Sequence, residues 1–309
     1  MGLSGPYQRG SLNKVLVIKN SDFHESTRSL PASKQVGMRN RYLIGATLLA
    51  GSLAFSQGPA DQELSADALA RQVVANEVKT QDDSHWMYQQ TTTKARMSET
   101  AEVIESKTGD LRRLLLRNGQ PLTWDQQRSE DEGMEKFVND AEQQRKQQQA
   151  ANEDSHKMMN LLTLSTEALT FSYAGQSANT IKLDFRPNPA FHPPSREAHV
   201  LHEMAGQVTI DKTHKRLVEI TGHLLHEVRF GGFLGHLDQG GTFDVRQEQV
   251  APNHWEVTLL KVDMKGKALF FKTISVQQDE TRSHFQRVPD TLALSDAAEL
   301  LSKQQASPN

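Results

Sequence analysis

Residues 255–276, WEVTLLKVDMKGKALFFKTISV, carry the clearest β-sheet pattern in the chain. Apolar and β-branched residues alternate with polar ones in residues 255–264, and a second run rich in such residues follows at residues 267–276. The Lys265-Gly266 pair between the two runs is typical of a tight turn. The segment therefore predicts a hairpin of two antiparallel strands.

Comparable runs recur along residues 180–289, separated by turn-forming residues at intervals of about ten to fourteen positions. The other predicted strands are 181–186, 203–210, 216–220, 224–230, 242–250 and 281–288. This spacing is typical of an antiparallel meander and not of βαβ units. Because side chains alternate across a strand, Trp255, Val257 and Leu259 would share one face. A sheet with one apolar face must curve around a helix or a ligand to bury that face.

The part of the chain before this sheet also has regular patterns. Apolar residues recur at helical spacing in residues 64–80, which predicts a helix. Residues 86–94 are rich in aromatic and β-branched residues and predict a strand. Residues 101–106 and 111–117 flank a turn at Gly109, so we expect them to form a hairpin.

Residues 124–170 differ in composition from the segments on either side. Gln, Glu, Lys and Arg dominate up to Lys157, and we expect two helices at residues 129–151 and 154–166. The first contains QQRKQQQ at residues 143–149 and lacks the repeated apolar positions of a coiled coil. We therefore interpret it as a helix whose polar surface faces solvent.

Together these patterns predict an α+β fold built on one long, curved antiparallel sheet, a half-barrel of about 9–11 strands. The N-terminal helix and the inserted helical segment would cover its concave face. We expect a single domain over residues 57–290, followed by a C-terminal helix or tail at residues 291–309.

Residues 38–56 have the composition of a secretory signal. Arg39 and Arg41 precede an uncharged apolar run at residues 42–55, and Ala54 and Ser56 suit cleavage before Gln57. The run is shorter than the roughly 20 residues of a membrane-spanning helix. We expect a cleaved signal and a soluble periplasmic or secreted protein, with an uncleaved anchor as the alternative. Residues 1–37 would be a start-site artefact or a disordered extension.

The charge and the cysteine content exclude several classes of protein. The chain has 35 basic and 38 acidic residues; residues 1–56 hold seven and two of these, which leaves 28 and 36, a net charge of −8. An acidic domain lacks the basic face that nucleic acid requires. With no cysteine in the chain, disulfides, Cys-ligated metals and thiol chemistry are excluded.

The order of these elements and one local segment resemble a known superfamily. Residues 206–220, GQVTIDKTHKRLVEI, are similar to the "strand, Ile-Asp, turn, Arg-Leu" hairpin of the periplasmic lipoprotein-carrier half-barrel superfamily, which includes outer-membrane lipoprotein-sorting proteins. The resemblance covers residues 62–288 and implies an open curved sheet whose concave apolar face receives acyl chains. The chain has a longer helical insert than the carriers and lacks the cysteine of their lipid-anchored receptors. No functional residue of the superfamily is transferred to a position here.

The apolar positions supply the candidate binding residues. They could line an acyl-chain groove or form an ordinary core beneath the helices, since both need the same side chains. The candidate groove residues are Trp86, Tyr88, Val208, Ile210, Leu217, Phe230, Trp255, Val257, Leu259, Phe270, Phe271 and Ile274.

Histidine-rich motifs do not identify a catalytic or metal site. The pairs His199/His202 and His223/His226 each precede a glutamate, but neither has the His-Glu-x-x-His order of a zinc protease. If these pairs lie on strands, the two imidazoles of each pair point to opposite faces. We nominate no catalytic residue, no metal ligand and no cofactor.

These observations favour a non-enzymatic binding or carrier protein. Its partner would be a lipid or acyl chain, possibly that of a lipoprotein, bound on the apolar face of the sheet. The alternative is a structural or regulatory cell-envelope domain that binds another protein through its sheet edge or its polar helix.

Overall fold

The computed structural model describes residues 64–79, 84–230, 235–268 and 272–304 of the chain. Most of these residues belong to one compact unit, which is the part considered below. The expected signal at residues 38–56 and the stretch 1–37 lie outside the described residues.

Within the described residues, thirteen strands form one antiparallel sheet, accompanied by five helices. The strands are β1 (His85–Lys94), β2 (Met97–Ser106), β3 (Gly109–Arg117), β4 (Gln120–Pro121), β5 (Leu169–Gln176), β6 (Thr180–Pro187), β7 (Met204–Asp211), β8 (Leu217–Leu224), β9 (Val228–Phe230), β10 (Gly235–Leu237), β11 (Thr242–Ala251), β12 (His254–Ala268) and β13 (Lys272–Val288). The helices are α1 (Ala66–Lys79), α2 (Trp124–Val138), α3 (Ala141–Ala168), α4 (Arg196–His202) and α5 (Leu294–Gln304).

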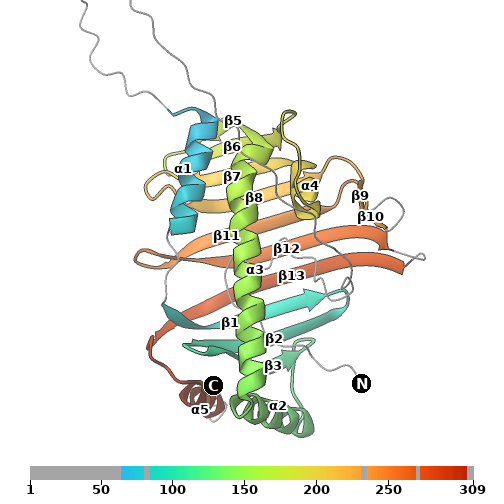
Figure 1. Cartoon of the computed structure of the whole chain (residues 1–309). Helices are drawn as coiled ribbons and strands as arrows, with labels where there is room; N and C mark the ends of the chain where they lie inside the picture. The colour runs from blue at the N-terminus through green and yellow to red at the C-terminus, as the bar shows by residue number, and fades with distance from the viewer. Residues whose placement is uncertain (1–63, 80–83, 231–234, 269–271, 305–309) are drawn as a thin grey trace, which may run out of the picture. The chain divides into compact units, whose positions relative to one another are not determined.

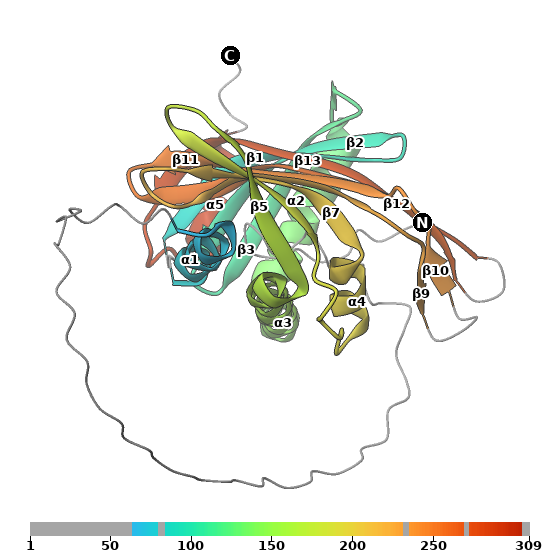
Figure 2. The same ribbon diagram turned by 90° about the horizontal axis from the view of Figure 1, so that it is seen from above.

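The sheet is open. Its strand order is β4-β3-β2-β1-β13-β12-β11-β8-β7-β6-β5, and the short pair β9-β10 branches from β12. Helix α3 crosses the sheet from β3 to β5 with α1 beside it (Figure 1). Seen from above, α1, α3 and α4 lie on the same side of the sheet (Figure 2). The predicted fold class is therefore confirmed, including the helical cover over one face.

The two helices of the insert do not meet where the sequence predicted. The break lies at Asn139-Asp140, because the Asp140 carboxylate caps α3 by accepting from the backbone N–H groups of Glu142 and Gln143. Helix α2 begins earlier than expected, with a capping box between Thr123 and Gln126. The predicted boundaries, 129–151 and 154–166, are wrong because the cap residues outweigh the continuous polar pattern.

The stretch of α3 up to residue 151, which was expected to face solvent, also contributes to a buried stripe. The buried residues of α3 are Gln147, Ala151, Asp154, Met158, Leu161 and Ala168. They recur at intervals of three, four or seven residues, as a sheet-facing helix surface requires. Gln147 Nε2 donates to the Asp110 carbonyl oxygen at 3.5 Å. The first part of the stripe was missed because Gln147 is polar and stands within the run QQRKQQQ.

The expected hairpin turn at Lys265-Gly266 is also wrong. Strand β12 continues through Gly266, which pairs with Ile274 of β13 and with Leu237 of β10. A Cβ atom at Gly266 would lie 2.0 Å from the His236 carbonyl oxygen, so glycine is needed here for close approach of β10 and not for a turn. The predicted strand 281–288 is the continuation of β13, not a separate strand.

Strand β12 contains an irregularity that changes which side chains face the core. Arg246 pairs with Leu259 whereas Gln247 pairs with Val257, so one residue of β12 is extra. Val257 and Leu260 are buried, while Leu259 is only partly buried. The expectation that Val257 and Leu259 lie on one buried face is therefore wrong.

Candidate functional site: an apolar cavity beneath α1 and α3

A small cavity of about 50 Å³ lies between α1, α3 and strands β5–β8. It is lined by Ala70, Val73, Val74, Glu77, Leu162, Ser165, Phe171, Leu183, Val208, Ile210, Leu217 and Ile220. All but Glu77 and Ser165 have apolar side chains. The lining comes from segments up to about 150 positions apart in the sequence, which the helical cover and the sheet bring together.

Helix periodicity and strand register place these side chains around one space. Ala70 and Val73 lie one turn apart on the buried face of α1. Val208 pairs with Leu183 of β6 and with Ile220 of β8. Since directly paired residues of antiparallel strands project to the same side, these three side chains face the helices together.

Glu77 of the cavity wall belongs to a buried ion pair with Arg216. Arg216 Nε and Nη2 donate to the two carboxylate oxygens of Glu77 at 2.8 and 2.9 Å. The backbone N–H of Leu217 donates to Glu77 Oε1 at 2.8 Å. The side chains of Glu77 and Arg216 are only 2% and 10% exposed. Each charge therefore depends on the other for compensation, and the pair fastens α1 to the start of β8.

Two further polar contacts hold α1 in place. The Phe171 backbone N–H of edge strand β5 donates to Asp67 Oδ1 at 2.8 Å. Asn76 Nδ2 donates to the Lys215 carbonyl oxygen at 3.2 Å. Thus α1 is attached by polar groups at both ends and by apolar contacts between them.

The structure gathers some of the predicted groove residues and separates others. Val208, Ile210 and Leu217 line the cavity, and Val257 belongs to the same core cluster without lining it. Trp255 lies beside the ion pair, its ring 5.8 Å from the Arg216 guanidinium.

The aromatic residues of β1 form a different cluster. Trp86 and Tyr88 pack with Val103, and their rings stack on His254 and Phe285 at centroid distances of 4.3 and 5.3 Å. The backbones of Phe230 and Ile274 lie in β9 and β13, whereas Phe270 and Phe271 fall outside the described residues.

The sequence interpretation missed the contributions of the two helices. The signal for Glu77 was available: it follows Val73 by four positions and so continues the apolar face of α1. A carboxylate on such a face indicates a buried cationic partner. Nothing in the sequence identified Arg216 as that partner.

The histidine motifs lie in a different arrangement from the one considered above. His199 and His202 are on helix α4, not on a strand, so both are near one face. They line a surface groove of about 580 Å³ together with Arg196 and Arg229. His202 Nε2 is 2.8 Å from the Asn188 carbonyl oxygen.

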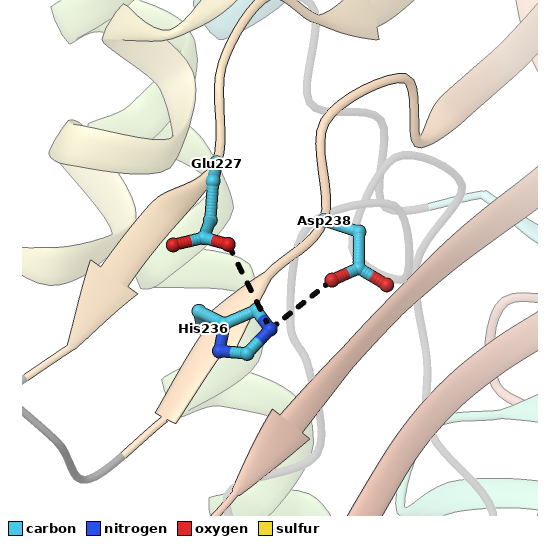
Figure 3. Close-up of side chains that lie close together, drawn as sticks. All are labelled: Glu227, His236 and Asp238. Atoms are coloured by element: carbon cyan, nitrogen blue, oxygen red, sulfur yellow. Dashed lines mark ion pairs between the residues drawn. The ribbon is translucent and has the colours of Figure 1, made fainter.

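A second cluster of polar side chains lies at the β9–β10 pair. His236 Nε2 is 3.2 Å from Asp238 Oδ1 and 3.8 Å from Glu227 Oε2 (Figure 3). One ligand atom from each residue lies within 4.8 Å of the others, so the cluster could hold a metal ion.

The fold and the cavity define the chain as an α+β protein with an open antiparallel sheet and a helix-covered apolar site. A scan against protein-family models, a search of curated proteins and a search of solved structures each found no match. Among the described residues, no helix is long and apolar enough to cross a membrane.

Proposed function

We propose that the protein is an exported, non-enzymatic binding or carrier module for the acyl chain of a lipid or of a lipidated partner. The observation that carries the proposal is the apolar cavity between the sheet and its two covering helices. Three residues nominated for an acyl-chain site from sequence, Val208, Ile210 and Leu217, contribute to its wall.

The cavity volume sets a condition on this function. Ligand pockets are typically about 300–1,000 Å³, so the cavity of about 50 Å³ accepts an acyl chain only when α1 and α3 move away from the sheet. Each buried methylene then contributes about 0.8 kcal/mol. Binding is therefore expected to exchange helix–sheet contacts for contacts with the chain of the ligand.

The test is displacement of a fluorescent fatty acid from the purified protein by dodecanoate. Ala70→Leu fills the cavity and should weaken binding by about tenfold, since losing contact with two methylene groups costs about 1.6 kcal/mol. Ala141→Leu, at an exposed position on α3, is the matched control and should bind like the unmodified protein. Equal binding by all three proteins, or none by the unmodified protein, would refute an acyl site in this cavity.

Export is tested separately from lipid binding. The intact mass of the protein recovered from outside the cytoplasm should correspond to a chain that begins at Gln57. Denaturation of this protein should release acyl chains. A mass that retains residues 38–56 would contradict cleavage, and recovery only from the cytoplasm would contradict export.

A second candidate function is supported by the exposed sheet edge. Strand β5 lies at one edge, and most of its residues are exposed, including Tyr173 at 49%. An edge strand offers backbone groups to which another protein can add a strand. Gln176→Pro would remove an N–H that points away from β6, since the N–H of the next residue, Ser177, donates to the Thr180 carbonyl oxygen of β6. Reduced capture of a protein partner with unchanged lipid binding would favour this alternative.

A further inference from the structure

We propose that Glu227, His236 and Asp238 bind one divalent transition-metal ion of the Zn²⁺ class. None of the three lines the apolar cavity, so this site is independent of the proposed lipid-binding function. The inference rests on the convergence of the three side chains, on the rigidity of the backbone that carries them, and on the way Arg229 orients one of the carboxylates.

The ligand atoms already lie near the spacing of a metal polyhedron. Tetrahedral zinc with bonds of about 2.1 Å places neighbouring ligand atoms about 3.4 Å apart. The distances from His236 Nε2 to Asp238 Oδ1 and Glu227 Oε2, 3.2 and 3.8 Å, lie on either side of that value. Both carboxylates point toward the same imidazole nitrogen (Figure 3). Small side-chain rotations would therefore complete the ligand set.

The backbone beneath the cluster is firmly anchored. Glu227 precedes Val228 and Asp238 follows Leu237, and these two apolar residues are paired with each other and fully buried. The Asp238 backbone N–H donates to the Lys265 carbonyl oxygen at 2.7 Å. Glu227 thus directly precedes β9, His236 lies within β10, and Asp238 directly follows β10, which is paired with β12.

Arg229 orients one carboxylate without occupying the ligand position. Its Nε donates to Glu227 Oε1 at 2.5 Å, whereas the oxygen nearest His236 is Oε2. A hydrogen bond to the non-ligating oxygen is the usual way in which a second layer of residues fixes a metal-bound carboxylate. The Arg229 side chain is 76% exposed and can keep this contact when an ion binds.

The donor types select the class of ion. One imidazole nitrogen with two carboxylate oxygens suits Zn²⁺ and its transition-metal neighbours, whereas Ca²⁺ and Mg²⁺ prefer oxygen-only sets. Three protein ligands leave room for water in the remaining position.

The test is equilibrium dialysis of EDTA-treated full-length protein against ZnCl₂. We expect one bound Zn²⁺ per chain, lowered in affinity by about tenfold or more in His236→Ala and in Asp238→Asn. His156→Ala, which removes an exposed histidine from α3, is the matched control and should bind Zn²⁺ normally. The thermal midpoint should rise with Zn²⁺ in the unmodified protein and not in Asp238→Asn, whose circular dichroism in EDTA checks its fold.

A neighbouring histidine pair provides the sharpest alternative. Glu203 lies 2.9 Å from His226 Nδ1 and 3.9 Å from His199 Nε2. Loss of Zn²⁺ binding in His226→Ala with full binding in His236→Ala would move the ion there and overturn the proposal. Absence of Zn²⁺ binding by the unmodified protein would also overturn it. Neither result would bear on fatty-acid displacement.

Discussion

The two ends of the sheet are held to their helices by different means. At the α1 end, which comprises β5–β8 with α1 and α3, a buried ion pair and a small cavity lie between helix and sheet. At the α5 end, which comprises β1–β3 with α2 and α5, apolar side chains of both layers form one cluster. Ile104 and Leu111 of the sheet pack there with Ala297 and Leu301 of α5.

The two ends also differ in how the charge of a buried arginine is compensated. At the α5 end, buried Arg113 donates to the Leu301 carbonyl oxygen and to Asp131, whose side chain is 47% exposed. At the α1 end, both members of the Glu77–Arg216 pair are withdrawn from water. Water can therefore compensate one partner at the α5 end but neither at the α1 end. Attachment of α1 should therefore depend steeply on this pair.

The largest expected effect comes from breaking that pair. Glu77→Ala leaves Arg216 buried and uncompensated, which should lower the free energy of unfolding by about 3–5 kcal/mol. Urea denaturation followed by circular dichroism measures it. Glu299→Ala, which removes an exposed partner of Lys303 on α5, is the control and should change the free energy of unfolding far less. Equal losses in the two variants would contradict the difference between the ends.

The two ends should also respond differently to a fatty acid after the same kind of core truncation. Leu183 lines the cavity and Ile104 lies at the α5 end, and both are fully buried. Leu183→Ala and Ile104→Ala should each cost about 2–5 kcal/mol. Dodecanoate should restore part of the loss only in Leu183→Ala, because only that truncation enlarges the cavity. Thermal midpoints with and without dodecanoate test this, and recovery of both variants or of neither would contradict it.

The branch β9–β10 depends on a single glycine. Gly266→Ala places a methyl group against the His236 carbonyl and should cost about 1–3 kcal/mol, with loss of Zn²⁺ binding. Gly133→Ala in α2, where a Cβ meets nothing within 4 Å, should instead stabilise by about 0.5–1 kcal/mol. Thermal denaturation of both variants measures the contrast, and similar changes in the two would disprove the close-approach role of Gly266.

Local patterns were sufficient to predict the fold class, α1 and the β2–β3 hairpin. In these elements, apolar residues recur at helical or strand spacing over eight or more positions. Recognisable turn residues such as Gly109 mark their limits. Strand β5, helix α4 and the three-residue strand β10 were missed, and β9 was predicted only as the end of a longer strand at residues 224–230. Short elements contain too few residues for a period to be evident, and their backbone is held by neighbours distant in the sequence.

The candidate site was only partly predictable for the same reason. Val208, Ile210 and Leu217 were nominated because they lie on apolar strand faces, and register brings them together. Leu259 was placed on the wrong side because the bulge in β12 depends on pairing with Arg246 and Gln247. The partnership of Glu77 with Arg216 joins positions 139 residues apart, which no local pattern contains.

The smallest expected effect concerns two glutamates at the α5 end of the sheet, whose ionisation should change the stability in opposite directions. Desolvation by burial raises the pKa of Glu102 above its ordinary value of 4.5, and the Arg113 charge only partly opposes this. The favourable contribution of Glu102 is therefore present below pH 4.5 and is lost as pH rises through its folded-state pKa. For Glu299 the hydrogen bond from Lys303 lowers the pKa, so its contribution is present above pH 4.5 and is lost as pH falls. Thermal midpoints should then rise in Glu102→Gln and fall in Glu299→Gln at neutral pH, both by small amounts. Shifts of the same sign would show that burial at the α5 end does not oppose ionisation of Glu102.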